Sequence, residues 1–131
     1  MTTWTIALPP GYSPDTRLTL FRCGANAGLH RMVRARITKK IRADTKTIAA
    51  ATPTITVPVS IRAVQHPAPG TRTCDSENIA PLVKAMIDGL RDAKVLINDS
   101  PAYVTEVTHA VGERRPGSQL VLHLTETVDT V

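Results

Sequence analysis

The chain has 131 residues, a formal net charge of +5 and two cysteines, Cys23 and Cys74. Its length suits a single domain, residues 1–131, in which residues 127–131 form a loose tail. There is no CxxC spacing, no charged leader before an apolar run and no apolar stretch of the roughly 20 residues that span a bilayer, so we expect a cytoplasmic protein with neither a zinc site nor a disulfide framework.

The first element is a predicted half-buried strand over residues 3–8. Apolar and polar residues alternate there, as in a strand with one buried face, and Pro9-Pro10-Gly11 ends the alternation. Residues 11–28 show no period and are rich in turn residues, which predicts a long loop.

A basic amphipathic helix is predicted from Leu29 onward. Its narrow apolar stripe consists of Leu29, Val33, Ile37, Ile41 and Ile48. Between Arg17 and Lys46 the one acid is Asp44, and such a basic excess favours polyanions. We expect DNA contacts from Arg31, Arg34, Arg36, Lys39 and Lys40. An ordinary solvated face is the alternative, and a membrane surface is a weaker one because the stripe lacks Trp and Phe.

A second strand is predicted over residues 55–63, where apolar residues again occupy alternate positions. Pro58 cannot donate a hydrogen bond to a neighbouring strand, which predicts that the strand lies at an edge or turns the missing N–H outward. The loop expected over 66–73 contains Arg72, which we add to the expected DNA contacts. No GxxxxGK[ST] phosphate loop occurs anywhere, so no small-molecule cofactor is expected.

A second amphipathic helix is predicted over residues 79–93, with Pro81 in its first turn. Glu77, Lys84 and Asp88 fall within about 20° of one line on its surface. If the chain turns back after this helix, the acids Asp75, Glu77 and Asp99 come together as a Mg²⁺ site, with Lys84 beside a phosphate. The alternative is a set of solvated acids at a helix N-terminus, where negative charge is favoured.

The last part of the chain predicts a β-hairpin. Residues 103–111 and 120–125 alternate in the manner of strands, and Gly112–Gly117 supplies the turn, with Arg114 and Arg115 at its tip. These arginines are either solvated or in contact with phosphates. The whole order β-α-β-α-β-β predicts an α/β (α+β) fold with two helices packed on a mixed sheet.

One stretch matches a known pattern in both order and spacing. The matching residues are Asp75-Ser76-Glu77-Asn78-Ile79-Ala80-Pro81, Lys84-Ala85, Asp88-Gly89-Leu90, Asp92-Ala93-Lys94 and Asn98-Asp99. They resemble the signature of the RusA family of Holliday junction resolvases, especially its phage-type members: Asp-x-Asp-Asn-Leu, often Ala-Pro, then Lys-Ala, Asp-Gly-Leu, Asp-Ala-Gly and Asp-Asp. The chain departs from this pattern at Glu77, Asn98 and Lys94.

The resemblance implies a homodimeric endonuclease that resolves four-way or branched DNA. It implies Mg²⁺, with Mn²⁺ as a substitute, held by Asp75, Glu77 and Asp99, and a catalytic set formed by these acids and Lys84. The rival hypothesis is a non-catalytic branched-DNA-binding protein descended from the same family, in which the changes at Glu77 and Asn98 have cost it cleavage. Glu77 adds a methylene at a metal that requires near-ideal geometry. A different nucleotide enzyme lacks a phosphate loop here, and a PD-(D/E)xK nuclease lacks its lysine two residues after Glu77.

Overall fold

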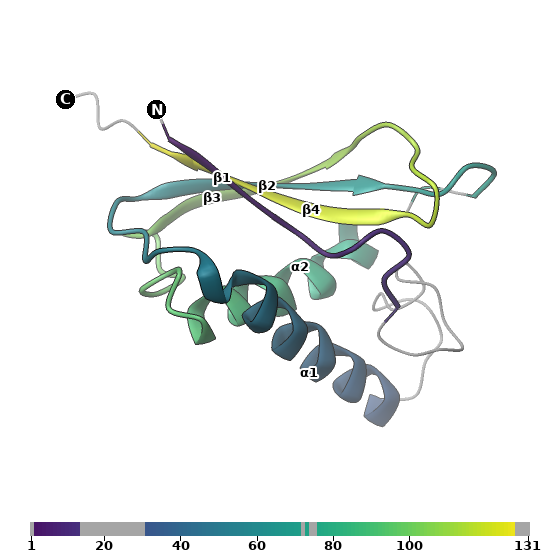
Figure 1. Cartoon of the computed structure of the whole chain (residues 1–131), viewed down its shortest axis with the longest axis horizontal. Coiled ribbons are helices and arrows are strands. Elements are labelled where there is room, and N and C mark those ends of the chain that lie inside the picture. The colour runs from purple at the N-terminus through teal and green to yellow at the C-terminus, as the bar shows by residue number, and fades with distance from the viewer. Residues whose placement is uncertain (1, 14–30, 72, 74–75, 128–131) are drawn as a thin grey trace.

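The computed structural model describes residues 2–13, 31–71, 73 and 76–127, with the backbone alone at 31 and 76–78. These residues form a mixed α+β fold, in which two long helices lie on one face of a four-stranded sheet (Figure 1). The elements are β1 (Thr3–Ala7), α1 (Arg31–Ile48), the short 3-10 helix η2 (Ala49–Ala51), β2 (Val59–His66), α2 (Ser76–Asp92), β3 (Val104–Val111) and β4 (Gln119–Glu126). The predicted mixed sheet with two packed helices is confirmed. Most of the loop predicted over 11–28, and the tail from residue 128, lie outside the described residues.

The strand order is β1-β4-β2-β3, so the predicted hairpin is wrong. Strand β2 lies between β3 and β4, parallel to the former and antiparallel to the latter. After β3 the chain continues along β2, since Gly112 N donates to Gln65 O (2.9 Å) and Arg115 N to Pro67 O (3.0 Å). It then crosses to the other side of β2. The mostly buried β2 thus lies in the centre of the sheet, and the mostly exposed β3 lies at the edge.

Two prolines lie elsewhere than predicted. Pro58 precedes the first residue of β2, and its carbonyl accepts a hydrogen bond from Thr127 N (2.9 Å). Because Pro58 is outside the strand, its missing N–H does not confine β2 to an edge, and the predicted edge position is wrong. Helix α2 begins at Ser76, so Pro81 lies in the second turn rather than the first. The proline ring costs the helix one backbone hydrogen bond there.

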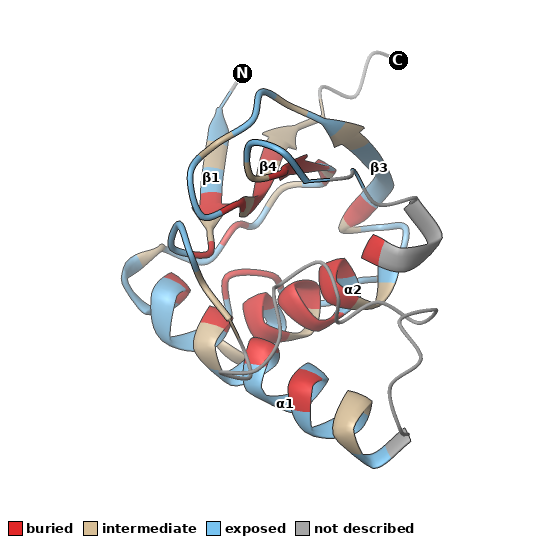
Figure 2. Cartoon of the chain, turned by 90° about the vertical axis from the view of Figure 1, so that its right-hand side faces the viewer, coloured by how far each residue is buried: buried red, intermediate tan, exposed pale blue. Residues whose placement is uncertain are grey.

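The core lies between the sheet and the helices, and Figure 2 shows their buried segments facing each other. Its largest fully buried side chains are Leu8, Ile37, Ile41, Ile61, Leu82, Met86, Leu90, Leu96, Leu120, Leu122 and Leu124. The predicted stripe of α1 is wrong at Ile48, which is 39% exposed. Steps of four residues from Ile41 lead instead to Thr45 and Ala49, and both are buried.

Helices α1 and α2 lie directly against each other at Gly89. A Cβ atom added there would lie 2.6 Å from the carbonyl oxygen of Arg42 and 2.8 Å from Cβ of Thr45. The first of these obstacles is backbone, which cannot rotate away as a side chain can. The glycine therefore sets how closely α2 approaches α1.

We predict that Gly89→Ala lowers the free energy of unfolding by about 1–3 kcal/mol, the usual cost of overpacking. The reverse exchange, Ala80→Gly on the exposed side of α2, is the control, with an expected loss of about 1 kcal/mol from helix propensity alone. Urea unfolding followed by circular dichroism measures both. A gain of about 1 kcal/mol in Gly89→Ala, the helix propensity without a clash, would contradict the close approach.

Candidate functional site

Helix α2 has one side that belongs neither to the core nor to the contact with α1. This side carries Lys84, Asp88 and Arg91, at spacings of four and three residues. Side chains at these spacings are neighbours on a helix surface. The three charges therefore form a short row along α2.

The chain reverses direction directly after α2. The carbonyl of Leu90 accepts hydrogen bonds from the backbone N–H groups of Val95 (2.9 Å) and Leu96 (3.3 Å). Lys94 has a φ of 62°, in the left-handed region that glycine adopts most readily. This reversal returns the chain along α2 and brings Asp99 to the row of charges.

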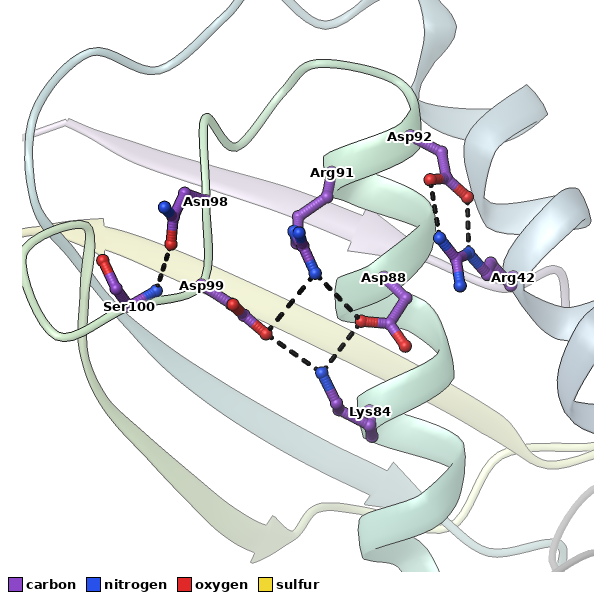
Figure 3. Close-up of polar contacts among 8 residues, drawn as sticks. All are labelled: Arg42, Lys84, Asp88, Arg91, Asp92, Asn98, Asp99 and Ser100. Carbon is purple, nitrogen blue, oxygen red and sulfur yellow. Dashed lines mark hydrogen bonds and ion pairs between the residues drawn. The ribbon is translucent and has the colours of Figure 1, made fainter.

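Four side chains form a charge cluster, which we define as Lys84, Asp88, Arg91 and Asp99 (Figure 3). Lys84 Nζ donates to Asp88 Oδ1 at 2.9 Å and to Asp99 Oδ2 at 3.0 Å. Arg91 Nη1 lies 3.8 Å from each of the same two oxygens. Two positive and two negative groups thus share one small surface.

Hydrogen bonding stabilises the charged forms of Lys84 and Asp99. The bond to Asp88, followed by the bond to Asp99, raises the pKa of Lys84 above its ordinary value. The bond from Lys84 holds the pKa of Asp99 below its ordinary value, and the charge of Arg91 acts in the same direction. Both groups are therefore charged at neutral pH, and the ammonium lies between two carboxylates.

The structure brings together two of the four residues assigned to catalysis. Lys84 and Asp99 are hydrogen bonded across 15 positions of sequence. Asp75 lies outside the described residues, and Glu77 is described only by its backbone, in the first turn of α2. The return of the chain after the helix, which the metal-site hypothesis required, is thus present as far as Lys84, where it brings Asp99.

Two members of the charge cluster were not assigned a role from the sequence. Asp88 shares the predicted line with Lys84, so helical spacing alone could have suggested their ion pair. Arg91 lies one further turn along, but its distance to Asp99 depends on the reversal after α2. Asn98, which replaces the first acid of the closing pair, accepts a hydrogen bond from Ser100 N (2.6 Å) and so stabilises the loop that carries Asp99.

The chemistry of the assigned donors fits a hard cation. Asp99 offers carboxylate oxygens, which Mg²⁺ prefers, on a partly exposed loop. Asp75 and Glu77 would supply carboxylates of the same kind. Within residues 2–13, 31–71, 73 and 76–127, no three His, Cys, Asp or Glu side chains form a metal-binding group, but two of the three assigned acids fall outside the side chains described there.

Helix α1 presents a basic surface. Of the residues expected to contact DNA, Arg36, Lys39 and Lys40 are exposed and Arg34 is half-buried, while Arg72 and the side chain of Arg31 lie outside the described residues. A neighbouring arginine, Arg42, is held by both oxygens of Asp92 on α2 (2.6 and 2.9 Å) and links the two helices. No helix in the described part of the chain is long and apolar enough to cross a membrane.

Arg114 was expected to be either solvated or in contact with phosphate. Its Nη1 instead donates to the backbone carbonyls of Ala68 (2.9 Å) and Thr71 (2.6 Å). The connection between β3 and β4 therefore holds the loop between β2 and α2, just before the stretch that contains Asp75.

Comparison of the chain with models of known protein families finds no match, and comparison with curated proteins finds none either. A functional assignment consequently depends on the residues and their geometry.

We predict that Asp92→Asn destabilises the protein at neutral pH and that this difference disappears in acid. The hydrogen bond from Arg42 lowers the pKa of Asp92 in the folded state. The pair therefore contributes fully above the unfolded pKa of about 3.9, and its contribution is lost as the pH falls through the lower folded value. Urea midpoints of both proteins between neutral pH and about pH 2 measure this.

Arg42→Gln removes the same ion pair and should show the same pH dependence. A difference between Asp92→Asn and the unaltered protein that stayed constant down to the lowest pH would show that Asp92 stabilises the fold in some other way.

Proposed function

We propose that the protein is a Mg²⁺-dependent endonuclease of the RusA type that cuts four-way or branched DNA by phosphodiester hydrolysis. The observation that supports this most directly is the 3.0 Å hydrogen bond between Lys84 and Asp99. The resemblance implies that these residues act together, and they are far enough apart in sequence for their contact to require the chain reversal after α2.

The acids and the lysine have separate tasks in this proposal. Asp75, Glu77 and Asp99 would hold Mg²⁺, with Mn²⁺ as a substitute, and the bound metal would supply an activated water and stabilise the leaving oxygen. Lys84 places a positive charge beside the scissile phosphate, where negative charge increases in the transition state. Arg91 adds a second positive charge that reduces the repulsion between DNA and the carboxylates.

The basic surface of α1 would bind the DNA backbone. Arg36, Lys39 and Lys40 are exposed along this helix, and we include Arg31, Arg34 and Arg72 in the same role. Contacts of this kind recognise phosphate rather than base sequence. They suit an enzyme that selects its substrate by the shape of a junction.

A second copy of the chain would complete the enzyme. A four-way junction has two-fold symmetry, and a symmetric dimer presents two equivalent sites to it. We place this dimer in the cytoplasm of a bacterium or a phage-infected cell, in DNA recombination, repair or phage DNA processing.

The second candidate is a protein that binds branched DNA without cutting it. The observation that favours it is that the two positive and two negative charges of the cluster neutralise each other. The two carboxylate oxygens nearest Lys84 each pair with both Lys84 and Arg91. Binding of a junction without cleavage under Mg²⁺ and Mn²⁺ would select this candidate.

We predict that Asp99→Asn and Lys84→Met each reduce cleavage of a synthetic four-way junction by at least about 100-fold in Mg²⁺. Junction binding, measured in Ca²⁺ to prevent cutting, should survive both changes. Asp92→Asn is the matched control, because Asp92 lies on the same helix and pairs with Arg42. Full activity of Asp99→Asn would refute the assignment of Asp99 to the catalytic site. Cleavage of fork and linear duplex substrates, compared with the junction, measures how far the enzyme selects branched DNA.

We also predict that Lys39→Gln weakens junction binding to a similar degree on all sequences. One fewer phosphate contact should reduce the slope of log affinity against log salt by about 1. Lys94→Gln, an equal loss of charge two residues after α2, is the control and should leave the slope unchanged. Equal slopes in all three proteins would place the DNA away from this part of α1.

A further inference from the structure

The least exposed member of the charge cluster is Asp88. Its side chain is 17% exposed, compared with 35% for Asp99, 42% for Arg91 and 58% for Lys84. We propose that Asp88 is a positioning residue, which holds the Lys84 ammonium at the site while Asp99 is engaged with the metal. This inference rests on the proposed endonuclease function.

Asp99 cannot be the sole anchor of Lys84. The lysine binds Asp99 through Oδ2, one of the two oxygens that Asp99 could offer to a metal. A divalent cation held by Asp99 would repel the ammonium and compete for this oxygen. Lysine also has a flexible stem with about 2 kcal/mol of rotamer entropy. Without a second partner, the Lys84 ammonium would therefore not stay beside the scissile phosphate.

Asp88 has the geometry of that second partner. It lies one helical turn after Lys84 and accepts from Nζ at 2.9 Å, so the pair is fixed by α2 itself and not by the loop that carries Asp99. Arg91 is further from Asp88, at 3.8 Å, and leaves the shorter contact to the lysine.

A cation on α1 also acts on Asp88 but belongs to a different ion pair. Arg42 is bonded to Asp92 at 2.6 Å, and its charge interacts with Asp88 only at longer range. Asp88 and Asp92 are thus two carboxylates on one helix with different partners. The first pairs with the lysine of the site, and the second joins α2 to α1.

The test compares Asp88→Asn and Asp88→Ala with Asp92→Asn as the matched control. In junction cleavage with Mg²⁺, both Asp88 changes should lower kcat by about 10-fold to 100-fold and leave KM within about twofold of the unaltered protein. The control should keep its kcat. Urea unfolding of every variant confirms that it is folded.

A second readout does not depend on cleavage. Nitrogen-15 NMR of the lysine ammonium groups, with Lys84→Arg to assign the signal, should show Lys84 retained in a hydrogen bond when Mg²⁺ is added to the unaltered protein and to Asp92→Asn. In Asp88→Ala this signal should be lost on addition of Mg²⁺. Normal kcat together with a retained signal in Asp88→Ala would overturn the inference alone, whereas no cleavage of any branched substrate by the unaltered protein would overturn the proposed function as well.

Discussion

Helix α2 has to pack against two neighbours at once, and most of the described structure depends on this. Its apolar side chains enter the core under the sheet, and Gly89 lets the backbone of α1 approach on another side. Only a narrow strip of the helix surface is therefore exposed to solvent. Lys84, Asp88 and Arg91 occupy that strip, so the packing that stabilises the fold also confines the charges to one place.

The fold class was predictable because alternation and helical spacing are local properties of the sequence. The hairpin was not, because the alternation of residues in β3 does not say which strand lies beside it, and both faces of β3 are mostly exposed. In the structure β3 and β4 both pair with β2 and not with each other. The residues of β2 after Ala63 are buried on both faces, as the central position of this strand requires. Pro58 misled for a related reason, since its effect depends on whether it lies inside the strand or one residue before it.

The site was predictable as far as the family pattern extends. Lys84 and Asp99 were named from that pattern, but their contact requires Lys94 in a left-handed conformation, which a lysine does not signal as a glycine would. Asp88 was visible on the helix line, yet its partner could have been any cation within reach. Only the interatomic distances show that Lys84, and not Arg91 or Arg42, is the nearest partner of Asp88.

The central place of β4 has a consequence for how the chain is made. Among the described strands, β1 is bonded only to β4, with Thr3 opposite Thr125. During synthesis at about 5–20 residues per second, β1 therefore waits on the order of ten seconds for its partner to be translated. Exposed threonines at positions 3 and 5 alternate with Trp4 and Ile6. The strand that stays unpaired during this time therefore has one polar face, which water can solvate until β4 is made.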